Sequence, residues 1–253
     1  MIQPEKEIFA RNELYWGHDF QKWLQNVHIA VFGLGGVGGY CVECLARAGV
    51  GELTIVDFDV VSESNINRQI IALNSSVGKK KTELWQERLL DINPSIKLNI
   101  IDDFYQGDDL LKSYDFVVDA IDTMRSKVAL LENCIKKGIP VISSMGAGNR
   151  VDPTKLYICD IADIEDKNAP FTSNVIYQLK KLGIEKGIPV VVSREKPFVM
   201  EKISQKENII TKSGDNIEFT KITPSSTPFV ASTAGIYMAY YIIENFKKEF
   251  QNG

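Results

Sequence analysis

The chain has 253 residues, 44% of them apolar and 25% charged, with a formal net charge of −4. Such a chain can bury a full core as one large globular domain, and its acidity argues against a uniformly basic nucleic-acid surface while leaving room for a local patch. No basic, apolar leader opens the sequence, and the most apolar late run, 229–243, is too short and too rich in Ser, Thr and Gly to span a bilayer. We therefore expect a cytoplasmic protein without a membrane partner.

Strands and helices are predicted to alternate through the first part of the chain. Branched apolar runs indicate buried strands, and proline and glycine mark where the intervening helices end. The predicted strands are 27–33, 52–57, 96–102, 115–120 and 139–144, and the predicted helices are 36–48, 79–91 and 123–137. This alternation predicts an α/β, Rossmann-like three-layer fold with a mostly parallel sheet and right-handed crossovers.

The pattern changes beyond residue 150. The expected elements there are a strand at 155–160, a helix at 171–182, a strand at 187–193, a hairpin with loops at 196–228 and a closing helix at 231–250. We interpret the whole chain, 1–253, as a single domain. Within it, 8–150 forms the nucleotide-binding core and 151–253 an elaboration for substrate or dimer contacts.

A glycine-rich turn follows the first predicted strand. Gly33, Gly35 and Gly38 have the G-x-G-x-x-G spacing, and Gly36 belongs to the same turn. The first glycine allows a tight turn, the second lets backbone amides approach phosphate, and the third lets the helix pack closely on the sheet. The helix that follows presents free N–H groups to an anion, and Asp57 ends the next strand about 20 residues later, where an acid can hold ribose hydroxyls. The spacing predicts a nucleotide site, and the alternative is a purely structural turn.

A polar segment follows the second predicted strand. In a short helix expected at 62–69, Asn65 and Arg68 share a face that looks towards the carboxyl ends of the strands. An arginine there can bind phosphate bidentately and neutralise developing charge, which indicates ATP chemistry and not hydride transfer. The alternative is that Arg68 is a surface or dimer-contact residue.

Two further groups of charges are candidates for the same site. The lysines at 79–81 open a predicted helix, and at most one of them can reach a given phosphate because successive helical residues point in different directions. Asp119 and Asp122 close the fourth predicted strand. Either acid could bind Mg²⁺ that bridges phosphates, or Asp122 could be the N-cap of the next helix, and both interpretations stay open.

Together, the segments 33–39, 57–59, 64–69, 78–81 and 119–122 resemble the adenylating domain of ubiquitin-activating-like enzymes, the ThiF/MoeB/HesA group. The resemblance covers residues 8 to about 160 and implies that a carboxylate is activated with ATP as an acyl-adenylate. It implies that Asp57 holds the ribose with Asp59 in the same nucleotide site, and that Asp122 holds Mg²⁺. It also implies that the phosphates are held by Asn65, Arg68 and Lys81. The residues expected to serve catalysis are Arg68, Lys81, Asp122 and Arg11.

The remaining sequence resembles one branch of this group. The chain has only one C-x-x-C pair, Cys41 and Cys44, so no zinc is expected. The segments 149–153, 160–163, 187–197 and 226–235 look like the tRNA threonylcarbamoyladenosine dehydratases. That branch adenylates the threonine carboxylate of a modified adenosine beside the anticodon, and the neighbouring carbamoyl group then closes a ring. The alternatives are adenylation of the Gly-Gly tail of a sulfur-carrier or ubiquitin-like protein, with a carrier or sulfur-donor partner, and a Rossmann oxidoreductase, which we disfavour.

The resemblance also implies partners. Family members are homodimers in which an N-terminal arginine reaches the partner's nucleotide, and Arg11 is the matching residue. Its alternative is an exposed arginine on an amphipathic helix. For tRNA, a basic rim is expected from Lys180, Lys181, Lys186, Arg194 and Lys196, and the alternative is a set of ordinary solvated cations.

Overall fold

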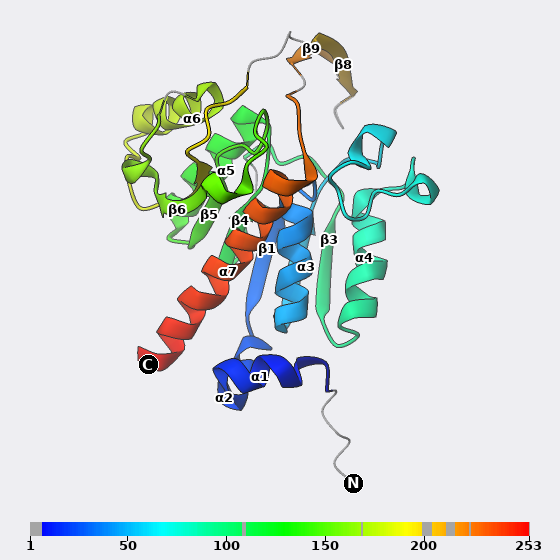
Figure 1. Ribbon diagram of the computed structural model, residues 1–253, viewed down its shortest axis with the longest axis vertical. Helices are drawn as coiled ribbons and strands as arrows, with labels where there is room; N and C mark the ends of the chain where they lie inside the picture. The colour runs from blue at the N-terminus through cyan, green and yellow to red at the C-terminus, as the bar shows by residue number, and fades with distance from the viewer. Residues whose placement is uncertain are drawn as a thin grey trace.

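The computed structural model describes residues 7–107, 110–167, 169–198, 204–210, 216–222 and 224–252. Within these residues, a seven-stranded sheet has the strand order β3-β2-β1-β4-β5-β7-β6 (Figure 1). All neighbouring strands are parallel except β6 and β7, which are antiparallel. The strands are β1 His28–Phe32, β2 Glu52–Val56, β3 Lys97–Ile101, β4 Phe116–Asp119, β5 Val141–Ser144, β6 Leu156–Asp160 and β7 Pro189–Ser193.

Helices cover both faces of this sheet, which explains why its central strands are apolar along their whole length. The α-helices are α1 Ala10–Trp16, α2 His18–Leu24, α3 Gly38–Ala48, α4 Lys81–Ile92, α5 Met124–Lys137, α6 Pro170–Lys181 and α7 Pro228–Asn252. One core cluster contains Leu45, Trp85 and Met238 from α3, α4 and α7, and the other contains Leu130 and Val175 from α5 and α6. The predicted α/β three-layer fold is confirmed.

Helix α7 packs against α3 at close range. A Cβ added to Gly235 would lie 2.2 Å from the carbonyl oxygen of Val37, so the two helices can approach this closely only because Gly235 has no side chain. Figure 1 shows α7 lying across the sheet beside α3, with its first turn at the same end as the turn that leads into α3. The C-terminal helix therefore belongs to the same hydrophobic core as the glycine-rich helix.

Some predicted boundaries were wrong. Helix α4 begins at Lys81, with Lys80 in the N-cap position, so the predicted helix at 79–91 started two residues early. The short helix expected at 62–69 is a 3-10 turn, η2, at Glu63–Asn65, because the Asn65 side chain accepts a hydrogen bond from the Ser62 amide and closes the turn on itself. Helices α1 and α2 were not predicted as elements.

The C-terminal elaboration also follows the prediction in outline. A separate antiparallel pair, β8 Ser204–Ile210 and β9 Asn216–Ile222, forms the expected hairpin. Other parts of the predicted segment 196–228, namely 199–203, 211–215 and 223, lie outside the described residues. Among the residues that are described, none of the helices combines the length and apolarity needed to cross a bilayer.

Candidate functional site

The glycine turn lies where the strand order reverses. Strand β1 has β2 on one side and β4 on the other, and open α/β sheets bind ligands at the carboxyl ends of such strands. Gly33 has φ +89°, and a Cβ there would lie 2.8 Å from the carbonyl oxygen of Ala120, at the end of β4. A Cβ on Gly38 would lie 1.8 Å from the carbonyl oxygen of Gly33. Both positions require glycine, so the turn is folded tightly between two strand ends and the start of α3.

Asp57 is bonded to this turn. One carboxylate oxygen accepts a hydrogen bond from the Leu34 amide at 2.6 Å, and the other accepts one from the Asp59 amide at 2.8 Å. Burial raises the pKa of Asp57 above its ordinary value, although the nearby Lys81 opposes the shift. The Asp59 side chain is 47% exposed against 7% for Asp57, so Asp59 presents the more accessible carboxylate. The expected ribose contact of this pair stays a prediction.

Lys81 is the lysine of the 79–81 run that turns towards the carboxyl ends of β1, β2 and β4, where the nucleotide is predicted to bind. We call this part of the sheet the nucleotide edge. Its side chain is 5% exposed, and its Nζ lies 2.7 Å from Asp59 Oδ2 and 3.8 Å from Asp57 Oδ1. Lys79 and Lys80 are exposed, and Lys80 pairs with Asp102 on the outside of the molecule. One lysine of the three is therefore buried beside Asp57 and Asp59, and its expected phosphate contact stays a prediction.

Arg68 packs against the glycine turn. Its Cγ is 3.3 Å from the position of a Cβ on Gly36, and its Nη1 donates to the carbonyl oxygen of Ser64 at 2.7 Å and to Asn67 Oδ1 at 2.9 Å. Burial lowers the pKa of Arg68, and the negative charge of Asp122 opposes that shift, which places Asp122 within its electrostatic reach. Arg68 is thus half-buried beside the turn and not a free surface arginine.

Asn65 is placed differently from the prediction. Its side-chain oxygen accepts a hydrogen bond from the Ser62 amide at 3.1 Å, so this oxygen closes its own turn. The expected face shared by Asn65 and Arg68 on a short helix does not form, because η2 ends at Asn65. The phosphate contact of Asn65 stays a prediction.

Asp119, the last residue of β4, and Asp122, three residues later, lie in different surroundings. The N-cap of α5 is Thr123, so the interpretation of Asp122 as the cap was wrong by one residue. Asp122 is exposed, and one of its oxygens accepts from Thr123 Oγ1 at 3.4 Å. Asp119 is fully buried and binds Lys127 Nζ at 2.6 Å, which excludes Asp119 as a ligand for a solvated ion.

The donor set at this edge fits Mg²⁺ bound together with phosphates. Within the described part of the chain, no group of three or more His, Cys, Asp or Glu side chains could hold a metal ion. Mg²⁺ is commonly held by one or two carboxylates plus waters and phosphate oxygens, so a single exposed carboxylate such as Asp122 suffices when a nucleotide supplies the rest.

Residues missed from the sequence join the C-terminal elaboration to this edge. Asn149, in the left-handed region at φ 60°, donates its amide to the Ser225 carbonyl oxygen at 2.7 Å, and its side-chain oxygen accepts from the Ser225 amide at 2.8 Å. Asn67 Nδ2 donates to the Ser226 carbonyl oxygen at 2.9 Å. Residues 225–226, just before α7, are therefore hydrogen-bonded to Asn149 in the loop after β5 and to Asn67, which is next to Arg68 in the chain. The segments 149–153 and 226–235 carried the resemblance to one branch, but no pattern in them indicated these hydrogen bonds.

The structure does not bring Arg11 to this site within one chain. Arg11 is an exposed residue of α1, and Figure 1 places α1 at the amino ends of the strands, opposite the glycine turn. Of the predicted basic rim, Arg194 pairs with Glu165 at 2.7 Å, and Lys181 Nζ lies 4.3 Å from the Tyr177 ring centroid. Lys180, Lys186 and Lys196 are exposed.

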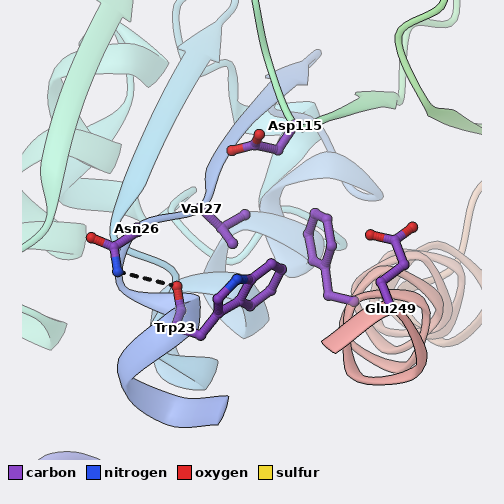
Figure 2. A pocket seen from close by; sticks show the side chains of 6 residues that line it. Trp23, Asn26, Val27, Asp115 and Glu249 are labelled. Atoms are coloured by element: carbon purple, nitrogen blue, oxygen red, sulfur yellow. Dashed lines mark hydrogen bonds between the residues drawn. The ribbon is translucent and has the colours of Figure 1, made fainter. Parts of the chain in front are cut away.

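A separate hollow lies at the far end of the sheet. This cavity has a volume of about 260 Å³ and is lined by Trp23, Asn26, Val27, Asp115, Phe246 and Glu249. Figure 2 shows their side chains. Val27 and Asp115 directly precede β1 and β4, so the hollow opens at the amino ends of these strands. Because open parallel sheets bind nucleotides at the carboxyl ends, this hollow is not the nucleotide site.

The fold and the charged groups around the glycine turn define the class of ATP-dependent adenylating enzymes with a Rossmann-like sheet. The model of the ThiF family matches residues 9–173. The chain is 39% identical over 247 residues to the tRNA threonylcarbamoyladenosine dehydratase of Bacillus subtilis, covering 96% of each protein. The chain therefore belongs to the ThiF family.

Other relatives extend the comparison. A crystal structure of the E. coli tRNA N6-threonylcarbamoyladenosine dehydratase in complex with ATP has a TM-score of 0.85 and 28% identity, and the match covers 100% of this chain and 99% of that one. The molybdopterin-synthase adenylyltransferase of Salmonella typhimurium is 34% identical over 157 residues, 60% of each protein.

Proposed function

We propose that this protein is an ATP-dependent tRNA threonylcarbamoyladenosine dehydratase acting in the cytoplasm. The observation that carries the proposal is the similarity to the Bacillus subtilis dehydratase, which extends over 96% of both chains and so includes the C-terminal elaboration. The charges at the carboxyl edge of the sheet are of the kind that adenylation requires, since pyrophosphate must leave from a highly charged nucleotide.

The reaction proceeds in two steps. The threonine carboxylate of the modified adenosine attacks the α-phosphorus of ATP, and pyrophosphate leaves. The neighbouring carbamoyl group then attacks the activated carbonyl carbon, loses a proton, closes a five-membered ring and expels AMP. Because both groups belong to one substrate, the second step has the advantage of proximity and needs no enzyme nucleophile.

The chain's residues divide the work of the first step. The amides of the glycine turn, with Gly35 at the closest approach, bind phosphate at the start of α3. Asp57 and Asp59 hold the ribose on the other side of the turn. Lys81 and Arg68, with Asn65 beside them, bind the phosphates and stabilise the charge of the leaving pyrophosphate. Asp122 would hold Mg²⁺, which when bound neutralises phosphate charge.

The proposal includes a homodimer. Helix α1, which carries Arg11, lies at the opposite end of the sheet from the glycine turn, so Arg11 acts at the nucleotide of a partner subunit. Exposed lysines at the end of α6, in the loop that follows it and after β7 supply a rim for the tRNA backbone, with Lys180, Lys186 and Lys196 as its members.

The test compares two acyl substrates. With threonylcarbamoyl-modified tRNA, the protein is expected to release AMP and pyrophosphate from ATP, and Arg68→Ala is expected to lose this activity. The second candidate function is adenylation of a carrier protein's Gly-Gly tail, favoured by the 34% identity to the molybdopterin-synthase adenylyltransferase. Turnover with a carrier tail and none with the modified tRNA would replace the first function by the second.

A further inference from the structure

We propose that Lys127 is a positioning residue for adenylation: it holds the Asp119 carboxylate so that the turn 119–122 presents Asp122 as the residue that would hold Mg²⁺. The inference rests on the proposed function, because it assigns a role in the same site. It concerns a buried ion pair that the sequence did not predict and that the mechanism above does not use.

Three elements meet at this ion pair. Lys127 comes from the first turn of α5, Asp119 from the end of β4, and Ser143 from the facing position on β5. The Nζ of Lys127 lies 2.6 Å from Asp119 Oδ2 and donates to Ser143 Oγ at 3.1 Å, while Ser143 Oγ donates to Asp119 Oδ2 at 2.6 Å. All three side chains are fully buried.

Stability alone is a poor reason for such a pair. Removing two charges from water costs more than an isolated pair usually returns, and apolar residues of similar volume often serve a core equally well. The surroundings of Lys127 offer such packing, because α5 otherwise contributes Leu130, Leu131 and Cys134 to the core. We therefore explain the buried charges by the turn of the chain that they hold in position.

What the pair fixes is the turn that follows β4. Lys127 and Ser143 engage one oxygen of Asp119, and the other accepts a hydrogen bond from the Ile121 amide at 3.2 Å. The amide of Ala120 donates to Phe32 at 2.9 Å, and the Ala120 carbonyl lies against Gly33. One short turn thus contacts the glycine turn and carries Asp122, an exposed carboxylate within electrostatic reach of Arg68.

Lys127 also fixes the end of this turn through its backbone. Its amide donates to the Thr123 carbonyl oxygen at 3.0 Å, which begins α5 directly after Asp122. Mg²⁺ demands a nearly ideal octahedral arrangement, so the direction of a lone carboxylate ligand decides how well it binds. Groups that orient a ligand in this way change metal affinity or activity by about 10- to 100-fold when removed.

The experiment uses full-length variants and two readouts. The variants are Lys127→Met, the double change Asp119→Asn with Lys127→Met, and the double change Asp119→Leu with Lys127→Met. Lys136→Met is the matched control, since Lys136 lies on the same helix in an exposed ion pair with Glu132. One readout is AMP release with modified tRNA at varied Mg²⁺. The other is calorimetric binding of AMP, and of ATP with and without Mg²⁺, together with thermal unfolding.

In Lys127→Met we expect the Mg²⁺-dependent gain in ATP affinity and the rate at limiting Mg²⁺ to fall by about 10- to 100-fold, with AMP affinity unchanged. Asparagine keeps an acceptor for the Ile121 amide without a charge, so the Asn–Met double variant is expected to recover most of the loss. The Leu–Met double variant also lacks an unpaired charge but has no acceptor, and it is expected to stay impaired.

The proposal is overturned if Lys127→Met gains as much ATP affinity from Mg²⁺ as wild type, or if the Leu–Met variant recovers as well as the Asn–Met variant. It is also overturned if the Asn–Met variant folds and stays as impaired as Lys127→Met. A wild-type protein that binds ATP with Mg²⁺ but does not turn over modified tRNA would refute the proposed function alone, because the binding readout still tests Lys127.

Discussion

The Nζ of Lys81 lies 2.7 Å from Asp59 Oδ2, and this pair closes the nucleotide edge between the end of β2 and the start of α4. Lys81 is buried and Asp59 is half-exposed, so the lysine is held in place by an acid that solvent or a ligand can still reach. A nucleotide phosphate entering this edge would meet an ammonium group that is already oriented.

Replacing Lys81 by methionine, which keeps most of its length, is expected to lower the rate of adenylation on the order of 100-fold, because one preorganised charge on the leaving phosphates is lost. Single-turnover AMP formation measures this rate. Lys80→Met serves as the control, since Lys80 points outward to Asp102. Equal losses in both variants would show that Lys81 has no special place at the phosphates.

Asn67 is expected to act through Arg68. Its oxygen accepts from Arg68 Nη1 at 2.9 Å while its amide nitrogen donates to Ser226, so Asn67→Ala frees the guanidinium and loosens the segment before α7. A displaced arginine is expected to reduce kcat by about 10- to 100-fold with a smaller change in the KM for ATP. Asn67→Asp, which keeps the acceptor, should recover part of kcat. If Asn67→Ala has wild-type kcat, Arg68 does not need this support.

Arg11 is expected to work between subunits. Arg11→Ala and Lys81→Met should each be nearly inactive alone, but when they are mixed and allowed to exchange subunits, one site of the mixed dimer regains both residues. AMP release in the mixture is therefore expected to exceed that of either variant. If mixing does not increase AMP release although mass measurement verifies subunit exchange, Arg11 is an exposed surface residue without a role at the partner's nucleotide.

The Glu43 side chain joins α3 to Arg88 of α4, and its ionisation makes the free energy of unfolding depend on pH. Burial favours its protonated form, but hydrogen bonds from Arg88 at 2.6 Å and from Arg47 at 2.8 Å outweigh this and lower the pKa of Glu43 below its ordinary value of 4.5. A lowered pKa in the folded state means that the stabilisation is complete above about pH 4.5 and is lost as the pH falls through the folded value.

Glu43→Gln is accordingly expected to reduce the free energy of unfolding by about 2 kcal/mol at pH 7, with a difference from wild type that shrinks below pH 4.5. Urea unfolding at several pH values measures this difference. Glu132→Gln, on the exposed ion pair of α5, should change stability much less. A constant difference between Glu43→Gln and wild type down to pH 3 would contradict the assignment.

Local patterns in the sequence were enough to predict the strands, the major helices and the edge of the sheet at which a nucleotide is expected. Apolar runs such as the one that forms β1 and the spacing of Gly33, Gly35 and Gly38 depend on local physics, namely burial of branched side chains and backbone freedom at glycine, so they could be identified without any contact being known. The strands and the major helices were accordingly found close to their observed bounds.

The surroundings of each charged side chain, by contrast, could be seen only in the folded protein. Asp119 and Asp122 are three residues apart, and by residue type either was a candidate for Mg²⁺, but Asp119 is buried against Lys127 and Ser143 while Asp122 is exposed within electrostatic reach of Arg68. The hydrogen bond of Asn67 could not be predicted from the sequence either, because its partner Ser226 lies 159 residues further along the chain. Charges act through space, and their partners come from other strands and helices, so residue type and spacing can nominate a polar side chain but cannot say which one the fold turns inward.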